Sequence, residues 1–209
     1  MLKRLFQRQN ASPDQLLGVD QARYVVFDTE LTGLDRKQDT IVSIGAIRMK
    51  GRQILLGETF YTLVNPQRDL THDNVRIHHI VPSELVNQPL IESALQQFLQ
   101  FVGDDILVGH FVHIDIAMLE NALGRKLPNR QVDTARYYDW LERNRRQFLG
   151  APNNGPIDTV LFDIANKLNI VLPGAHNALV DAYLTAQVWQ RLLIDLPDFG
   201  IVRIKDLRQ

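Results

Sequence analysis

Residues 24–34 of the chain read YVVFDTELTGL. Its apolar run from Tyr24 to Phe27 is typical of a buried strand. The strand ends in two acids, Asp28 and Glu30, which stand two residues apart. Because side chains alternate between the two faces of a strand, both carboxylates leave the same face of the sheet.

Two neighbouring carboxylates of this kind favour a metal site. Like charges on one face repel each other and raise a pKa unless a cation lies between them. Oxygen ligands are also those that a hard cation such as Mg²⁺ takes. The alternative is a polar strand end that enters a turn at Thr32-Gly33, and this pair alone does not decide between the two.

The sequence after this strand predicts an antiparallel meander. Residues 40–49 are rich in β-branched side chains, and Lys50-Gly51-Arg52 indicates a tight turn into a strand over residues 54–64.

Alternating helices and short strands follow. Helical spacing predicts helices over residues 90–102, 116–123, 160–168 and 178–193. Residues 106–108 predict a short strand, and the polar, Gly-, Pro- and Asn-rich residues 144–157 a long loop. Three strands followed by strand–helix alternation indicate one α/β domain with a mixed sheet.

Composition excludes several classes of function. The 209 residues include no cysteine, which excludes zinc fingers, thiol redox chemistry and cysteine nucleophiles. The net charge of −1 gives no indication of a polyanionic partner. Binding of a nucleic acid would therefore depend on local positive charge or on bound metal. No apolar run approaches the roughly 20 residues that span a bilayer, so we expect no membrane contact and a cytoplasmic protein.

Three residues in the second half of the chain add to the first pair of acids. Asp181 has apolar neighbours on both sides, and a buried carboxylate is costly unless it is paired, hydrogen-bonded or bound to metal. His176, five residues earlier, follows Pro173-Gly174 and suits a general base on a loop. Asp115 opens a helix, where it would also favour the positive end of the helix dipole.

Taken in order, these motifs resemble those of the DEDDh 3′–5′ exonuclease family. The matching residues are Asp28-Thr29-Glu30 with Thr32-Gly33, then Gly109-His110-x4-Asp115, then His176-x4-Asp181. The family includes the proofreading subunit of bacterial replicative polymerases and ribonuclease T. The resemblance spans about residues 22–193 and implies a ribonuclease-H-like fold, with a mixed five-stranded sheet and helices on both faces.

The resemblance also implies roles for residues. Asp28, Glu30, Asp115 and Asp181 would hold two divalent ions, Mg²⁺ or Mn²⁺, and His176 would be the general base. Substrate contacts would fall on Leu31, Thr32, Gly33, His110 and Phe111. Four residues depart from the usual pattern: Leu31, where Thr is frequent, Phe111 for Asn, Ile114 for Phe and His79 for Gly. These departures affect substrate preference rather than reaction class.

The implied activity is removal of nucleotides from a single-stranded or frayed 3′ end of DNA or RNA, of the DNA proofreading or repair type. An exoribonuclease and a non-catalytic, proofreading-like binding module are the alternatives. A DNA polymerase is a candidate partner, although the short segment after the last helix favours a stand-alone or accessory enzyme. Arg143, Arg145 and Arg146 would bind phosphate or form a solvated charged face.

The chain divides into three predicted parts. Residues 1–20 form a basic tail with a short helix that the capping-box pattern Ser12-Pro13-Asp14-Gln15 predicts. A transit segment is the alternative for residues 1–13. Residues 21–195 form the exonuclease domain, and residues 196–209 a C-terminal extension.

Overall fold

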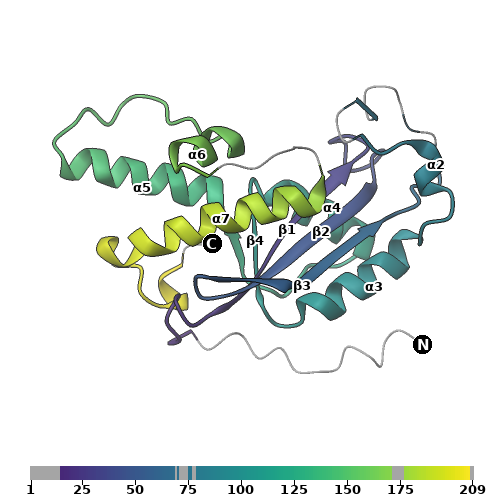
Figure 1. Ribbon diagram of the computed structural model, residues 1–209, viewed down its shortest axis with the longest axis horizontal. Coiled ribbons are helices and arrows are strands. Elements are labelled where there is room, and N and C mark those ends of the chain that lie inside the picture. Colours follow the sequence, from purple (N-terminus) through teal and green to yellow (C-terminus); the bar gives the residue numbers. More distant parts are fainter. Residues whose placement is uncertain (1–14, 69, 71–74, 77–78, 171–176, 208–209) are drawn as a thin grey trace.

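The protein folds around one five-stranded mixed sheet (Figure 1). The computed structural model describes residues 15–68, 70, 75–76, 79–170 and 177–207. The strands are β1 (Arg23–Leu31), β2 (Ile41–Lys50), β3 (Gln53–Leu63), β4 (Ile106–Gly109) and β5 (Gln131–Asp133), in the order β3-β2-β1-β4-β5. The predicted meander is confirmed, because β1–β2 and β2–β3 pair antiparallel. Strand β4 pairs parallel with both β1 and β5.

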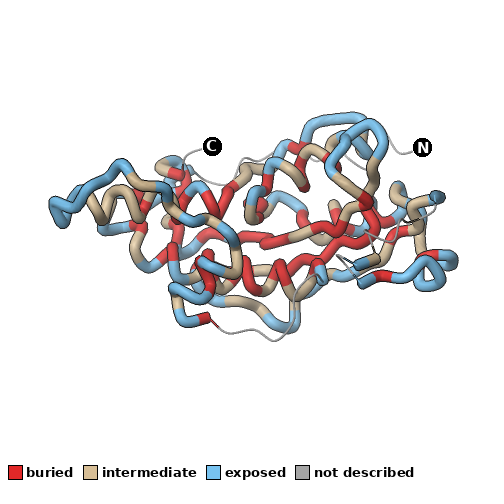
Figure 2. Tube along the Cα trace, turned by 90° about the horizontal axis from the view of Figure 1, so that it is seen from above, coloured by how far each residue is buried: buried red, intermediate tan, exposed pale blue. Residues whose placement is uncertain are grey.

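Helices cover both faces of the sheet, as predicted. They are α2 (Pro82–Leu85), α3 (Ile91–Val102), α4 (His113–Leu123), α5 (Thr134–Phe148), α6 (Leu161–Lys167) and α7 (Ala178–Asp195). Helices α3 and α4 pack on one face, and α5, α6 and α7 on the other. Figure 1 shows α7 running across the sheet, and Figure 2 shows the strands as a buried layer between helices.

Strand β1 shows why the sheet is covered on both sides. Tyr24 and Val26 join the core cluster beneath α7, and Val25 and Phe27 join the cluster beneath α3 and α4. All four side chains are fully buried. A strand buried on both faces reads as a continuous apolar run, which is the pattern that residues 24–27 show.

Part of the predicted loop over residues 144–157 is wrong, because α5 extends to Phe148. Asp133 caps this helix by accepting a hydrogen bond from the backbone N–H of Ala135. Along its polar surface, Arg143 pairs with Asp139 and Arg145 with Glu142, at spacings of four and three residues that stabilise a helix. These pairs keep the polar end of α5 helical. Strand β5, which has only three residues, was not predicted.

Both ends of the described chain pack against the domain. Gly18 forms a β-bridge with Arg203, and the N–H of Val19 donates to the carbonyl of Val202. Val19 and Ile204 belong to the core cluster beneath α7. The short helix predicted from residues 12–15 falls almost wholly outside the described residues. The three-part division of the chain stays a prediction.

Within the described residues, no helix combines the length and apolar character needed to cross a membrane.

Candidate active site

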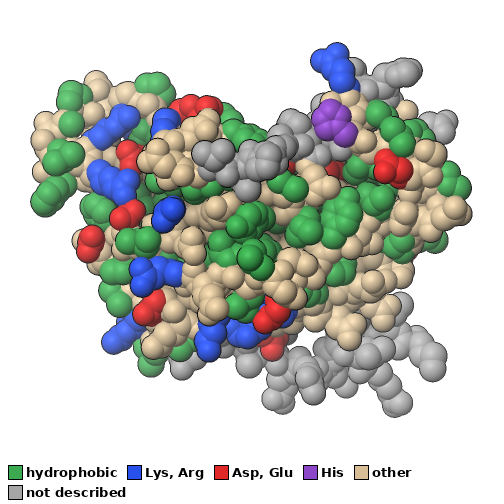
Figure 3. Space-filling view, in the orientation of Figure 1, with side chains coloured by type: hydrophobic (Ala, Val, Ile, Leu, Met, Phe, Trp, Pro, Cys, Tyr) green, Lys and Arg blue, Asp and Glu red, His purple; other side chains and the backbone are tan. Residues whose placement is uncertain are grey.

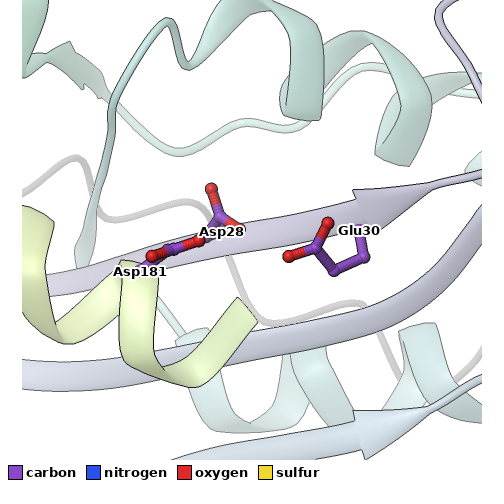
Figure 4. Close-up of side chains that lie close together, drawn as sticks. All are labelled: Asp28, Glu30 and Asp181. Atoms are coloured by element: carbon purple, nitrogen blue, oxygen red, sulfur yellow. The ribbon is translucent and has the colours of Figure 1, made fainter. Parts of the chain in front are cut away.

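Three carboxylates meet above the end of β1. Asp28 and Glu30 extend from β1, and Asp181 comes from the first turn of α7 (Figure 4). Each residue offers a carboxylate oxygen, and these oxygens all lie within 4.8 Å of one another. Glu30 and Asp181 are buried and Asp28 is partly exposed. The sequence motifs separated by about 150 residues therefore form one cluster.

A glycine lets α7 approach the sheet closely enough to build this cluster. Gly45 of β2 lies beside Asp28 in the β-ladder. A Cβ at residue 45 would come within 2.1 Å of the backbone nitrogen of Leu179 and 2.2 Å of the carbonyl carbon of Ala178. Only a residue without a side chain permits this contact, because both atoms belong to the helix backbone. Asp181 lies two residues after Leu179.

Asp115 lies beside this group but is held from the other face of β1. Its Oδ1 accepts hydrogen bonds from the hydroxyl of Thr29 at 2.5 Å and from the backbone N–H of Thr29 at 3.1 Å. Thr29 points to the face opposite Asp28 and Glu30, because it is the residue between them. Asp115 is 6% exposed. Its charge nevertheless reaches Asp28, where it is the strongest of the neighbouring charges that raise the pKa.

Asp28, Glu30 and Asp115 are held in an environment that disfavours negative charge and raises their pKa values. Burial raises the pKa of Asp28 well above its ordinary range, and the charges of Asp115, Glu30 and Asp181 add to this effect. Burial and the charges of Asp181 and Asp115 raise the pKa of Glu30 to about 7. Burial raises the pKa of Asp115 to about 7, although the hydrogen bonds from Thr29 act in the opposite direction.

The cluster fits a hard divalent cation. Its donors are carboxylate oxygens, the ligands that Mg²⁺ and Mn²⁺ prefer. A cation between these oxygens would offset both the burial and the mutual repulsion that raise the pKa values of Asp28 and Glu30. Asp28, Glu30 and Asp181 are the residues that would hold it.

Thr32 and Gly33, predicted substrate contacts, form a tight loop with Asp39. The hydroxyl of Thr32 donates to Asp39 and accepts from the backbone N–H of Thr40. A Cβ at Gly33 would come within 2.4 Å of the Asp39 carboxylate. Leu31, just before them, is half-buried and packs against the core beneath α3 and α4.

His110 contacts protein groups on both sides of its ring. Nδ1 lies 2.9 Å from the hydroxyl of Thr134, and Nε2 lies 2.8 Å from the carbonyl oxygen of Thr159. Because a carbonyl oxygen only accepts hydrogen bonds, Nε2 carries a proton. Burial lowers the pKa of His110, against the effect of the Thr159 carbonyl. His110 thus connects β4, α5 and the segment before α6, and its substrate contact stays a prediction.

Phe111 presents its ring at the surface beside the site. It has a φ of 52°, in the left-handed region, and its backbone N–H donates to Asp133. Its side chain is among the exposed large apolar ones. Its ring centre lies 6.5 Å from that of His113, the first residue of α4. An exposed ring suits packing against a base better than the alternative of ordinary core packing.

His176, the predicted general base, lies outside the described residues. Asn177, the next residue, caps α7 by accepting from the backbone N–H groups of Leu179 and Val180. Tyr61 of β3 forms a side-chain hydrogen bond with Asn177, and burial together with the charges of Glu84 and Glu30 raises the pKa of Tyr61. Tyr61 therefore contacts the cap of α7 and lies near enough to Glu30 to feel its charge.

Two further observations concern positions outside the three motifs. His79 has a φ of 58°, which explains why glycine is common at this position in the family that the sequence resembles. Of the arginines considered for phosphate binding, Arg143 pairs with Asp139, and Arg145 pairs with Glu142 and Asp195. Cations and acids are likewise interspersed around the α5 end of the face shown in Figure 3. These pairs favour the solvated charged face.

The sequence of this chain matches that of a known protein family. The RNase T family, described as an exonuclease family, matches residues 25–189, so the chain belongs to this family. The prediction that the chain is an exonuclease is thereby confirmed. Among its relatives is the DNA polymerase III subunit epsilon of Aquifex aeolicus, which is 34% identical over 83% of this chain and 81% of that subunit.

Other relatives are much longer, and solved structures confirm the fold. The PolC-type DNA polymerase III of Caldanaerobacter subterraneus is 32% identical over 90% of this chain, but the match spans only 13% of that polymerase. Exonuclease X in complex with 5′ overhanging duplex DNA superimposes with a TM-score of 0.64 and 20% identity, over 88% of this chain and 98% of its own. Exonuclease I of E. coli in complex with a dT13 oligonucleotide superimposes with a TM-score of 0.72 and 19% identity. The match covers 86% of this chain and 42% of that chain.

Proposed function

We propose that this chain hydrolyses the terminal phosphodiester bond at the 3′ end of a single DNA strand and releases nucleoside monophosphates one at a time. The observation that carries this proposal is the cluster of Asp28, Glu30 and Asp181, whose oxygens lie within 4.8 Å of one another. In an enzyme of the exonuclease family, an acidic cluster of this kind suits paired divalent ions that bind a phosphate.

Each acid has a distinct task in this proposal. Asp28, whose pKa the charges of both Glu30 and Asp115 raise, would help to hold the Mg²⁺ or Mn²⁺ ions. Glu30 and Asp181 would complete one ion site, and Asp115 would hold the second. When bound, such ions lower the pKa of an attacking water and stabilise the charge on the leaving 3′ oxygen.

The protein's own residues then orient the reaction. Thr29 holds the carboxylate of Asp115 in one orientation through two hydrogen bonds to its Oδ1. His176 takes the proton of the attacking water, as the family motif implies. Asn177 caps α7 and thereby holds Asp181 beside Asp28.

The groups around the mouth of the site suit an unpaired strand. Leu31 and Phe111 offer apolar surface without hydrogen-bonding groups that read a base edge. Stacking on such groups is tolerant of sequence. A matched duplex end must first open, at a cost of a few kcal/mol that is smallest for a mismatch.

The relatives support DNA as the substrate. The epsilon subunit and the PolC-type protein are both named as parts of DNA polymerase III. A replicative or repair polymerase is therefore the partner that we propose, which would place the protein with the chromosome in the cytoplasm of a bacterial cell.

Rates on five oligomers test the proposed substrate. Single-stranded DNA and a duplex with a mismatched 3′ end should be shortened faster than a blunt matched duplex, at one salt concentration and with Mg²⁺ present. Single-stranded DNA should also be preferred to RNA of the same sequence, and a second DNA sequence should be shortened at a similar rate. Equal rates on single-stranded and blunt duplex DNA would refute the proposed preference for an unpaired 3′ end. Faster cleavage of RNA would refute DNA as the proposed substrate.

A further inference from the structure

A groove of about 710 Å³ runs along the free edge of the sheet, outside the acidic cluster. We call it the edge groove. It lies between α4 and α5, beside β5, and the segment that joins α4 to β5 closes one end. Strand β5 is the last strand of the sheet, so one side of its backbone faces this groove.

The edge groove begins next to the active site. His113, which lines it, is the first residue of α4 and stands two residues before Asp115. Asp133, which also lines it, is close enough to Asp115 that its charge raises the pKa of that carboxyl. Asp133 also accepts the backbone N–H of Phe111. A strand that leaves the site over Phe111 and His113 would therefore enter the groove.

The charges along the groove favour an anionic ligand. Its cations are the exposed Arg36, Lys126 and Arg136, and its acids are Glu120 and Asp133. Both acids already form hydrogen bonds or ion pairs with other groups of the protein. Glu120 binds Lys126 at 2.5 Å and the backbone N–H of Leu127.

Asp133, the second acid, is 8% exposed and accepts from two backbone N–H groups. Arg36 lies close enough to Glu120 to help lower its pKa. Neither Arg36 nor Arg136 forms an ion pair within 4.0 Å in the part of the chain that the structure describes. Two arginines are therefore left to bind anions.

The floor of the groove suits bases. Val112, Ile116 and Leu127 give it buried apolar side chains, and Trp140 lines it half-buried. Proteins that bind single strands without sequence preference combine a cationic groove that follows the phosphates with aromatic and apolar surface for the bases. The edge groove has both components.

We propose that the edge groove binds the part of the single strand that lies upstream of the 3′-terminal nucleotides, with Arg36 and Arg136 on its phosphates. This inference rests on the proposed function and specifies where its substrate lies. It explains how a chain with a net charge of −1 holds a polyanion beyond the reach of bound metal.

Substrate length separates the groove from the active site. In the Arg36→Gln/Arg136→Gln double variant, the KM for an oligo-dT of about 20 nucleotides should rise about tenfold, because each phosphate contact adds to the affinity. The KM for a dT trinucleotide and the kcat for both should change less than about twofold. Against salt, the slope of log Kd for the long oligomer should fall by about 0.7 for each contact removed.

Two controls make this test specific. Arg191→Gln removes one exposed arginine from α7, outside the groove, and should leave both KM values unchanged. Trp189 is fully buried, so quenching by the long oligomer should arise from Trp140 and vanish in Trp140→Phe.

The outcomes separate failure of the groove from failure of the proposed function. An unchanged KM for the long oligomer in the double variant would overturn the proposal, and the free edge of β5 would then suit an extended peptide instead. An equal rise for the trinucleotide would overturn it as well. Lack of hydrolysis of both the trinucleotide and the long oligomer by the unmodified protein would instead refute the proposed function.

Discussion

Gly45 and Leu179 lie so close together that a Cβ at residue 45 would approach the backbone nitrogen of residue 179 to 2.1 Å. Asp28 pairs with Gly45 across the sheet, and Asp181 follows Leu179 in α7. The contact between a strand and a helix therefore sets the distance between two of the clustered carboxylates.

Replacement of Gly45 by alanine should push α7 away from β2 and separate Asp181 from Asp28. We expect the affinity for Mn²⁺ and the kcat to fall about 10–100-fold, the range seen when groups that orient metal ligands are changed. Calorimetric titration of the metal-free protein with Mn²⁺ measures the affinity. Gly57→Ala in β3 is the matched control, because nothing lies within 4 Å of a Cβ there. Equal losses in both variants, or none in Gly45→Ala, would contradict this role.

Removal of one clustered acid should separate activity from stability. Asp28→Ala or Asp181→Ala should abolish cleavage, because each removes a proposed metal ligand. The melting temperature without metal should hold or rise, since each change relieves repulsion among buried carboxylates. Thermal unfolding with and without Mn²⁺ measures both effects, and stabilisation by the metal should occur in the unmodified protein alone. Full cleavage by either purified variant would refute the metal assignment.

The stability of the metal-free protein should depend on pH in the direction that the raised pKa values set. The pKa values of Glu30 and Asp115 are about 7 in the folded protein, against 4.5 and 3.8 as ordinary values. Groups with a raised pKa contribute stability that is fully present below the ordinary value and is lost as pH rises through the folded value. The melting temperature should therefore fall from pH 6 to pH 8.

Glu30→Gln tests this origin, because it removes one of the two groups whose pKa is about 7. Its melting temperature should vary less between pH 6 and pH 8, and saturating Mn²⁺ should flatten or reverse the trend in the unmodified protein. A melting temperature that rises from pH 6 to pH 8 without metal would contradict this account, because it would show that ionisation of the carboxylates does not destabilise the folded protein.

His176→Ala should lose activity by roughly 10²–10⁴-fold, the usual contribution of a positioned general base. Binding of Mn²⁺ should be retained, because the proposed ligands are Asp28, Glu30 and Asp181. Calorimetry with Mn²⁺ and single-turnover cleavage measure the two effects. Loss of Mn²⁺ binding would make His176 a metal ligand instead of a base.

Sequence patterns predict the parts of this fold that have a strong local signal. Residues 24–27 are apolar throughout because β1 is buried on both faces, and the long apolar stripe of α7 shows its helical period. Strand β5 has three residues, which is too short for any period. The polar end of α5 is stabilised by ion pairs instead of apolar burial, so its composition resembles a loop.

The sequence motifs predicted the acids of the site but not the residues that position these acids. Asp28, Glu30 and Asp181 belong to motifs that local sequence displays. Thr29 binds Asp115 across 86 positions of the chain, and Gly45 contacts a helix that starts more than 130 residues later. Such contacts depend on how β1, α4 and α7 pack, which no local pattern records.

End-labelled DNA tests most directly whether the acidic cluster is the centre of a metal-dependent 3′–5′ exonuclease. A single-stranded oligomer labelled at its 5′ end should shorten in steps of one nucleotide when Mg²⁺ is present. The same oligomer labelled at its 3′ end should release its label at once as a mononucleotide. Neither product should form with excess EDTA or with Asp181→Ala. Release of the 5′ label first, or unchanged shortening by Asp181→Ala, would contradict the assignment.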